Sequence, residues 1–172
     1  MTRLANMEKA GYFPLPPLVT NLISTFITAP HGGRIFDPCA GEGTALVSLA
    51  ETLALSPYGV ELHEERAQLA RQKIQAFEAR LLVANRSAQL PTQTRLLHDS
   101  YQNVQASRDG FTLLYLNPPY DQDQQESGRS TRLEVQFLTR TRSYLQPGGL
   151  LVYVVPQHLL KLRKLTEYLL SH

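Results

Sequence analysis

Apolar residues along the chain alternate between two arrangements, each typical of one kind of secondary structure. Short continuous apolar runs are typical of buried strands, whereas apolar residues three or four positions apart are typical of amphipathic helices. The two patterns follow one another from Ile35 onward, which predicts an α/β fold with a doubly wound, mostly parallel sheet. Strands are expected at residues 34–36, 58–61, 95–100, 111–116 and 150–155. Helices are expected at residues 18–28, 44–54, 63–82, 133–145 and 157–170.

The most distinctive turn follows the fourth expected strand, where Asn117-Pro118-Pro119-Tyr120 ends the apolar run. Two prolines stop the strand, because they lack an N–H for the sheet and fix the backbone. Open α/β sheets bind ligands at the carboxyl ends of their strands. An amide side chain, a carbonyl before proline and an aromatic ring at that edge suit a flat molecule that carries an amino group. The alternative is a strand-ending turn without chemistry.

A second candidate site is the loop after the first expected strand, Asp37-Pro38-Cys39-Ala40-Gly41-Glu42-Gly43-Thr44. Strand, glycine turn and helix in this order receive nucleotides in α/β proteins, because glycine lets the backbone come close to a ligand. The loop lacks the third glycine of the dinucleotide fingerprint and the lysine of the Walker A motif. An ordinary glycine-rich turn is the alternative.

Acidic residues end the next two expected strands. Glu61 comes roughly 20 residues beyond the glycine loop, where an acid commonly accepts hydrogen bonds from ribose hydroxyls, and Leu62 beside it could lie against an adenine ring. Asp99, followed by Ser100, ends the third strand. The alternatives are a surface carboxylate at Glu61 and a turn cap at Asp99. The charged residues of the helix at 63–82 are expected to face solvent; they include Glu64, Glu65, Arg66, Arg71 and Lys73.

Together these motifs resemble class I S-adenosylmethionine-dependent methyltransferases of the N6-adenine DNA methylase type, in an uncharacterised prokaryotic branch. The resemblance runs from Gly11 to Leu170 and implies a Rossmann-like methyltransferase fold with S-adenosyl-L-methionine as cofactor. Leu15 stands where the N-terminal motif of those enzymes usually has threonine. The catalytic residues that the resemblance implies are Asn117, Pro118, Pro119 and Tyr120. The cofactor contacts that it implies are Tyr12, Phe13, Pro14, Asp37, Pro38, Cys39, Ala40, Gly41, Gly43, Thr44, Glu61, Leu62, Asp99, Ser100 and Asn117.

The activity that this resemblance implies is methyl transfer to an exocyclic amino group, first of all adenine N6 in DNA. The Asn117 side-chain oxygen and the Pro118 carbonyl would accept the two N–H bonds of that group, and Tyr120 would stack on the base. The same tetrapeptide serves RNA and protein-glutamine amino-methyltransferases, so these substrates stay open. A non-catalytic cofactor-binding subunit and an unrelated nucleotide-binding α/β domain are further alternatives.

Size and composition are those of a single globular domain in a reducing cytoplasm. The 172 residues are 42% hydrophobic, and a single cysteine, Cys39, excludes an internal disulfide. No apolar stretch has the length of a membrane span, and no Cys/His cluster has metal-ligand spacing, so neither membrane nor metal is expected. The net charge of +2 permits a nucleic acid partner without arguing for one. An N-terminal arm and helix at 1–33 are expected to precede a methyltransferase core at 34–172.

The last expected strand, at 150–155, has no charged residue and is expected to form an edge of the sheet. The core of the resembling family normally continues with two more strands, which this sequence does not show. An apolar edge invites pairing with another chain. We therefore expect either that the sequence is a fragment or that a second copy or a partner subunit covers this edge.

Overall fold

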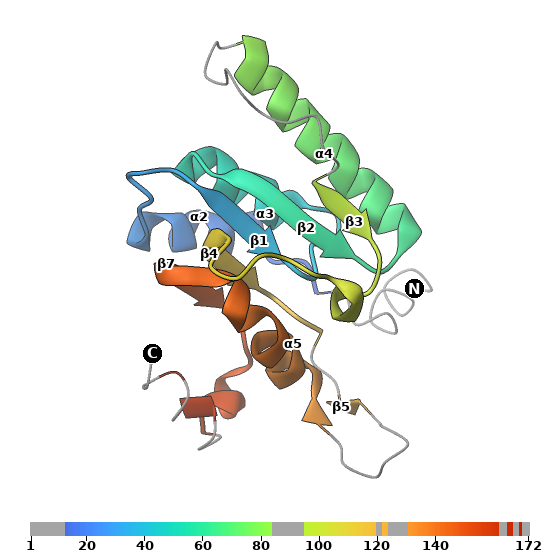
Figure 1. Cartoon of the computed structure of the whole chain (residues 1–172), viewed down its shortest axis with the longest axis vertical. Coiled ribbons are helices and arrows are strands. Elements are labelled where there is room, and N and C mark those ends of the chain that lie inside the picture. The colour runs from blue at the N-terminus through green and yellow to red at the C-terminus, as the bar shows by residue number, and fades with distance from the viewer. Residues whose placement is uncertain are drawn as a thin grey trace.

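The computed structural model describes residues 13–83, 95–119, 122–123, 131–161, 165–166 and 169. Its main element is a parallel sheet with the strand order β3-β2-β1-β4-β7, flanked by helices (Figure 1). The predicted α/β fold with a mostly parallel sheet is thereby confirmed. The strands of this sheet are β1 (Arg34–Asp37), β2 (Ser56–Glu61), β3 (Leu96–His98), β4 (Phe111–Leu116) and β7 (Leu145–Tyr153).

The centre of the sheet is the point where the chain reverses its direction of winding. β1 pairs with β2 on one side and with β4 on the other, through Phe36 opposite Tyr58 and Leu114. The strands that follow β1 directly in sequence extend the sheet one way, and β4 and β7 extend it the other way. Ligands of doubly wound proteins bind at this switch point, beyond the carboxyl ends of the two central strands. The loops after Asp37 and Leu116 both begin there.

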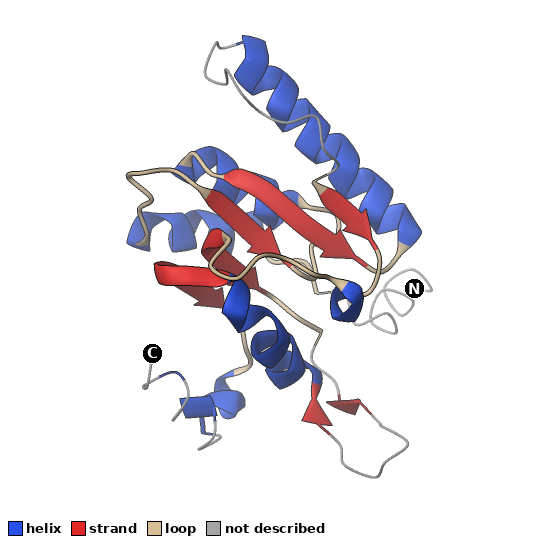
Figure 2. Ribbon diagram, in the orientation of Figure 1, coloured by secondary structure: helices blue, strands red, loops and turns tan. Residues whose placement is uncertain are grey.

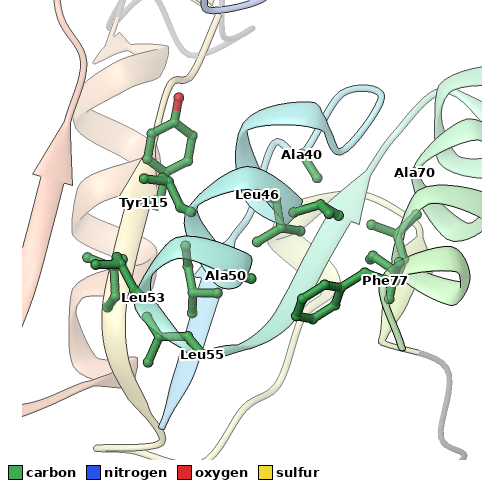
Figure 3. Close-up of a cluster of buried hydrophobic side chains, with 14 of the residues drawn as sticks. Ala40, Leu46, Ala50, Leu53, Leu55, Ala70, Phe77 and Tyr115 are labelled. Carbon is green, nitrogen blue, oxygen red and sulfur yellow. The ribbon is translucent and has the colours of Figure 1, made fainter. Parts of the chain in front are cut away.

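Helices cover both faces of the sheet (Figure 2). One apolar cluster lies between the sheet and the helices α3 and α4, with Ile23 of α2 at its border. Leu46, Ala50, Phe77 and Tyr115 belong to this cluster (Figure 3). A second cluster on the opposite face includes Leu138 of α5. The bounds of the helices are α2 (Pro17–Phe26), α3 (Thr44–Leu53), α4 (Glu64–Val83) and α5 (Leu133–Thr141).

The last strand begins earlier than predicted. β7 runs from Leu145 to Tyr153, whereas the predicted strand covers only 150–155, and Gln146-Pro147-Gly148-Gly149 before it has the composition of a turn. The turn residues are inside the strand as an irregularity of the β4–β7 register, because Phe111 pairs with Leu145 and Leu113 already pairs with Leu150. Gly148, with φ of +73°, provides the backbone conformation that this bulge needs.

The other differences concern short segments. Two short strands that the sequence did not predict, β5 (Gln122–Asp123) and β6 (Thr131–Arg132), pair antiparallel. The helix predicted at 133–145 changes to a 3₁₀ turn, η2, at Arg142–Tyr144. A 3₁₀ helix, η3, at Gln157–Lys161 begins the region where an α-helix was predicted. A further 3₁₀ turn, η1 (Tyr101–Asn103), follows β3.

The described part of the chain shows neither a membrane-spanning helix nor a metal-binding cluster. None of the described helices combines the length and the apolar character that crossing a bilayer requires. No group of three or more His, Cys, Asp or Glu side chains in the described ranges converges as a metal site.

Candidate active site

The glycine loop is held against β2 and α4 by hydrogen bonds and close packing. The Ala40 N–H donates to the Val60 carbonyl at 2.8 Å, and the Gly41 N–H donates to Oε2 of Glu61, also at 2.8 Å. Gly43 has φ of +75°, and a Cβ at this position would lie 3.0 Å from both Cα and Cβ of Ala70 on α4. Glycine is therefore required at Gly43 by its backbone conformation and by the approach of α4.

Glu61 connects the glycine loop to the first turn of α4. While Oε2 accepts from Gly41, Oε1 accepts from the His63 N–H at 2.9 Å and from Nε of Arg66 at 3.0 Å. Arg66 completes an ion pair through a second nitrogen at 2.8 Å, with its side chain only 18% exposed. The prediction that Arg66 faces solvent is therefore wrong, because its guanidinium turns back towards the end of β2.

A cavity of about 260 Å³ lies beside Glu61, at the carboxyl ends of β2 and β3. Glu61, Leu62, Asp99 and Ser100 line it, and so do Pro38 and Cys39 of the glycine loop. All six are among the cofactor contacts that the resemblance implies. The apolar wall on the other side, which the sequence does not indicate, is formed by Leu133 and Phe137 of α5. Their i, i+4 spacing showed that they share one helix face, but not that this face borders a ligand cavity.

Asp99 is exposed at the rim of this cavity, which is the larger of the two cavities that border the glycine loop. Oδ1 of Asp99 accepts hydrogen bonds from Nδ2 of Asn103 at 2.8 Å and from the Ser100 N–H at 2.6 Å. These two donors lower the pKa of Asp99 below its ordinary value, so the side chain is an acceptor over the whole physiological range. The hydroxyl of Ser100 accepts from the Gln102 N–H and caps η1.

A smaller cavity of about 40 Å³ lies on the other side of Cys39. It is bordered by the ends of β1 and β4, the start of α3 and the N-terminal segment. Cys39 lines both cavities, so the glycine loop separates them by a single residue. The residues around the smaller cavity are Phe13, Pro14, Leu15, Asp37, Cys39, Ala40, Thr44, Ala45, Tyr115 and Asn117.

The carboxyl group of Asp37 is the main charge in the wall of the smaller cavity. Asp37 is 2% exposed, and its Oδ1 accepts from the Cys39 N–H at 3.0 Å. Burial raises the pKa of Asp37 to about 7, against the hydrogen bond from Cys39, which lowers it. Burial also raises the pKa of the Cys39 thiol, and the nearby Asp37 raises it further. A cation in this cavity would stabilise the ionised form of Asp37.

The Asn117 corner opens onto the same small cavity. Nδ2 of Asn117 donates a hydrogen bond to the main-chain carbonyl of Phe13 at 2.9 Å. Pro118 is buried, and Pro119 lines the larger cavity. The structure thus brings the turn after β4, the glycine loop and the N-terminal segment into one site. Tyr12 and Tyr120, which the sequence also assigned to the site, lie outside the described residues.

Solved structures that are similar to this chain include S-adenosylmethionine-dependent methyltransferases. A Listeria monocytogenes protein assigned to the class I S-adenosylmethionine-dependent methyltransferases superposes with a TM-score of 0.68 at 14% identity, over 96% of this chain and 55% of that one. A type I restriction-modification methyltransferase subunit from Streptococcus thermophilus gives 0.64 at 18% identity, over 86% and 35%. A methyltransferase from Thiobacillus denitrificans, in complex with S-adenosyl-L-homocysteine, gives 0.57 at 15% identity, over 98% and 68%. The chain therefore spans about half or less of the first two proteins.

The sequence identifies the family directly. The chain belongs to an uncharacterised methyltransferase family (DUF6094), whose profile matches residues 1–165. No protein of curated function matches the sequence.

Proposed function

We propose that the chain is an S-adenosylmethionine-dependent methyltransferase that methylates an exocyclic amino group, adenine N6 in DNA. The observation that carries this proposal is the shared wall of the small cavity. Asp37 and Thr44 of the glycine segment and Asn117 of the β4 turn line this one cavity, although the chain separates them widely. A donor held along the glycine loop would therefore lie beside any amine that the Asn117 corner holds.

The two cavities fit the two ends of S-adenosylmethionine. The larger one offers carboxylates at Glu61 and Asp99 for hydroxyl and amino donors, and apolar walls at Leu62 and Phe137 for a flat ring. The smaller one offers the buried Asp37 carboxyl for an ammonium group, and the hydroxyl of Thr44 at the first turn of α3 for a carboxylate. Their junction at Cys39 is where the sulfonium between the two ends would pass.

When bound, S-adenosylmethionine supplies a methyl group that is already activated for transfer. The task of the chain is to hold the acceptor nitrogen. Because the Phe13 carbonyl can only accept a hydrogen bond, it binds the NH₂ end of the Asn117 amide. Oδ1 and the Pro118 carbonyl would accept from the amino group, which favours a lone pair directed away from the ring and stabilises developing positive charge. An amide does not ionise, so no strong base is implied.

Two observations support DNA adenine as the acceptor. The tetrapeptide of the corner resembles that of N6-adenine DNA methylases, and one solved protein of this fold is the methyltransferase subunit of a type I restriction-modification system. The net charge of +2 is compatible with a polyanionic substrate. In a duplex, the base would first have to leave the stack to reach the Asn117 corner.

A labelled-methyl assay tests the proposal. The protein is incubated with S-adenosylmethionine that carries a tritiated methyl group and, in parallel, with DNA, RNA and a mixed protein substrate. We expect the label in DNA, and in N6-methyladenine after digestion to nucleosides. Label in RNA or in protein glutamine would identify that polymer, and not DNA, as the substrate. Binding of S-adenosylhomocysteine without any transfer would indicate a non-catalytic subunit, and no binding at all would exclude the cofactor.

A further inference from the structure

A groove adjoins the cavity beside Glu61. This groove between η1 and α5, of about 620 Å³, is lined by Tyr101, Gln102, Val135, Gln136, Thr139 and Arg140. Tyr101 and Gln102 line the larger cavity as well, so the two hollows share a wall.

Arg140 provides the charge of the groove. Nη2 of Arg140 donates to the Gln102 carbonyl at 2.6 Å, which holds the guanidinium over the groove. No carboxylate is among the residues that line it, and the neighbouring acid of α5, Glu134, is fully buried and paired with Arg132. A guanidinium has five N–H donors in a planar fork, which suits it to bind the oxygens of a phosphate. The groove thus presents an exposed cation without an acid in its lining.

Tyr101 provides a ring of fixed orientation next to this cation. Its ring stacks on Phe137 with centroids 3.6 Å apart and an angle of 19° between the planes. The side-chain amides of Gln102 and Gln136 add donors and acceptors beside the ring. A cation, an aromatic ring and amide groups in one groove form the combination that holds single-stranded nucleic acid, through phosphate contacts and contacts with bases.

We infer that the η1–α5 groove binds the single strand that adjoins the target base, with a phosphate at Arg140. This inference rests on the proposed nucleic acid substrate. α5 begins at Leu133, which lines the larger cavity together with Pro119 of the catalytic corner, and it leads to Arg140. Seven residues of helix span about 10 Å, which corresponds to about three steps of a stacked strand at 3.4 Å each. The groove therefore receives a phosphate a few nucleotides from the base at the Asn117 corner.

The test is the affinity of the full chain for a short fluorescent single-stranded oligodeoxynucleotide, measured by anisotropy over a range of salt concentrations. Arg140→Gln should raise the Kd about 5-fold at 0.1 M salt and reduce the slope of log Kd against log salt by about 0.7, since one phosphate contact is lost. Arg140→Lys keeps the charge, and its Kd should lie between those of the wild type and Arg140→Gln. Arg80→Gln is the matched control, because Arg80 is an exposed arginine of α4 that lies far from the groove in sequence and pairs with Glu51 at 3.4 Å.

Each outcome either supports or overturns the η1–α5 groove as a binding site for single-stranded nucleic acid. Equal Kd values for the wild type and Arg140→Gln overturn the groove, and so does an equal loss in Arg80→Gln, which would mean unspecific attraction. No oligonucleotide binding by the wild type overturns both the groove and the nucleic acid substrate. A thermal shift with S-adenosylhomocysteine, which neither arginine should change, shows that the variants are folded. If Arg140→Gln does not fold, Thr139→Glu places an anion in the groove from an exposed position and must weaken binding for the inference to stand.

Discussion

Asn117 and Phe13 are 104 positions apart in sequence, yet the Asn117 side chain donates to the Phe13 carbonyl at 2.9 Å. This hydrogen bond ties the N-terminal segment to the turn after the central strand β4. It also assigns the two ends of the Asn117 amide, because a carbonyl oxygen accepts only from the NH₂ end. The side-chain oxygen that the proposed reaction needs is at the other end of the amide.

Removal of the Asn117 amide should separate chemistry from cofactor binding. We expect Asn117→Ala to lower the methyl transfer rate by about 100-fold or more, because a donor–acceptor group aimed at the reacting atom is lost. The Kd of S-adenosylhomocysteine, measured by calorimetry, should stay within a few-fold of the wild type. Asn21→Ala on the exposed side of α2 is the control and should leave both quantities unchanged. A wild-type transfer rate in Asn117→Ala would remove Asn117 from the mechanism.

Cofactor affinity should depend on pH through Asp37. An ammonium group in the small cavity requires the carboxylate form, whereas the empty protein has a pKa of about 7 for Asp37. Below pH 7 a proton must leave before the ligand binds, so the Kd of S-adenosylhomocysteine should rise about tenfold per pH unit. Above pH 7 the Kd should level off. In Asp37→Asn the affinity should be low, and the inflection near pH 7 should disappear. A wild-type profile that is flat between pH 5 and 8 would contradict this role.

The same carboxyl group should lower the stability of the empty protein at high pH. Its pKa is about 7 in the folded state and 3.8 in the ordinary reference, so the folded state holds the proton more tightly. Between these values stability falls as pH rises, by about 1.4 kcal/mol per pH unit, and above pH 7 the loss is complete. Asp37→Asn removes this slope. Urea unfolding should therefore show the variant to be more stable than the wild type at pH 8 and not at pH 4.

Gly43 and Gly148 allow the effects of crowding and backbone conformation to be separated. Both have a positive φ, +75° and +73°, but a Cβ at Gly43 meets Ala70 at 3.0 Å, whereas at Gly148 nothing lies within 4 Å. Gly148→Ala should lower the free energy of unfolding by about 1–2 kcal/mol through backbone strain alone. Gly43→Ala should cost about 1–3 kcal/mol more, because α4 has to move. An equal decrease in the free energy of unfolding of the two variants, measured by urea unfolding, would mean that α4 can shift at no energetic cost.

The sequence was informative where local pattern decides the structure. The strand at Phe111–Leu116 has its predicted bounds, because a continuous apolar run is stopped by two prolines. The loop between Asp37 and Thr44 was recognisable because glycines follow a strand and precede a helix. The position of Glu61 at the end of the second strand was recognisable because it ends a short strand-like run roughly 20 residues beyond the glycine loop. These features depend on residues that are close together in sequence.

The features that the sequence did not predict depend on contacts between distant segments. Gln146-Pro147-Gly148-Gly149 has the composition of a turn, and only pairing with β4 makes it a bulge inside β7. Arg66 has the spacing of a solvent-facing residue, and only the end of β2 draws it into an ion pair. Phe137 looks like an ordinary core position of α5, and only its place beside η1 makes it a cavity wall. In each case a partner from another element decides the role.

The pairing of β1 with β4 has a consequence for how the protein is made. Nearly half of the chain lies between Ile35 and its partner Leu113, so β1 leaves the ribosome long before its second neighbour is synthesised. During that interval its open side can pair with other chains, and the burial of Phe36 must wait. When β4 pairs with β1, the same step brings Asn117 to the cavity that Asp37 lines. A nascent chain that has not yet folded its centre has therefore no complete pocket, and ligand binding reports on completed folding.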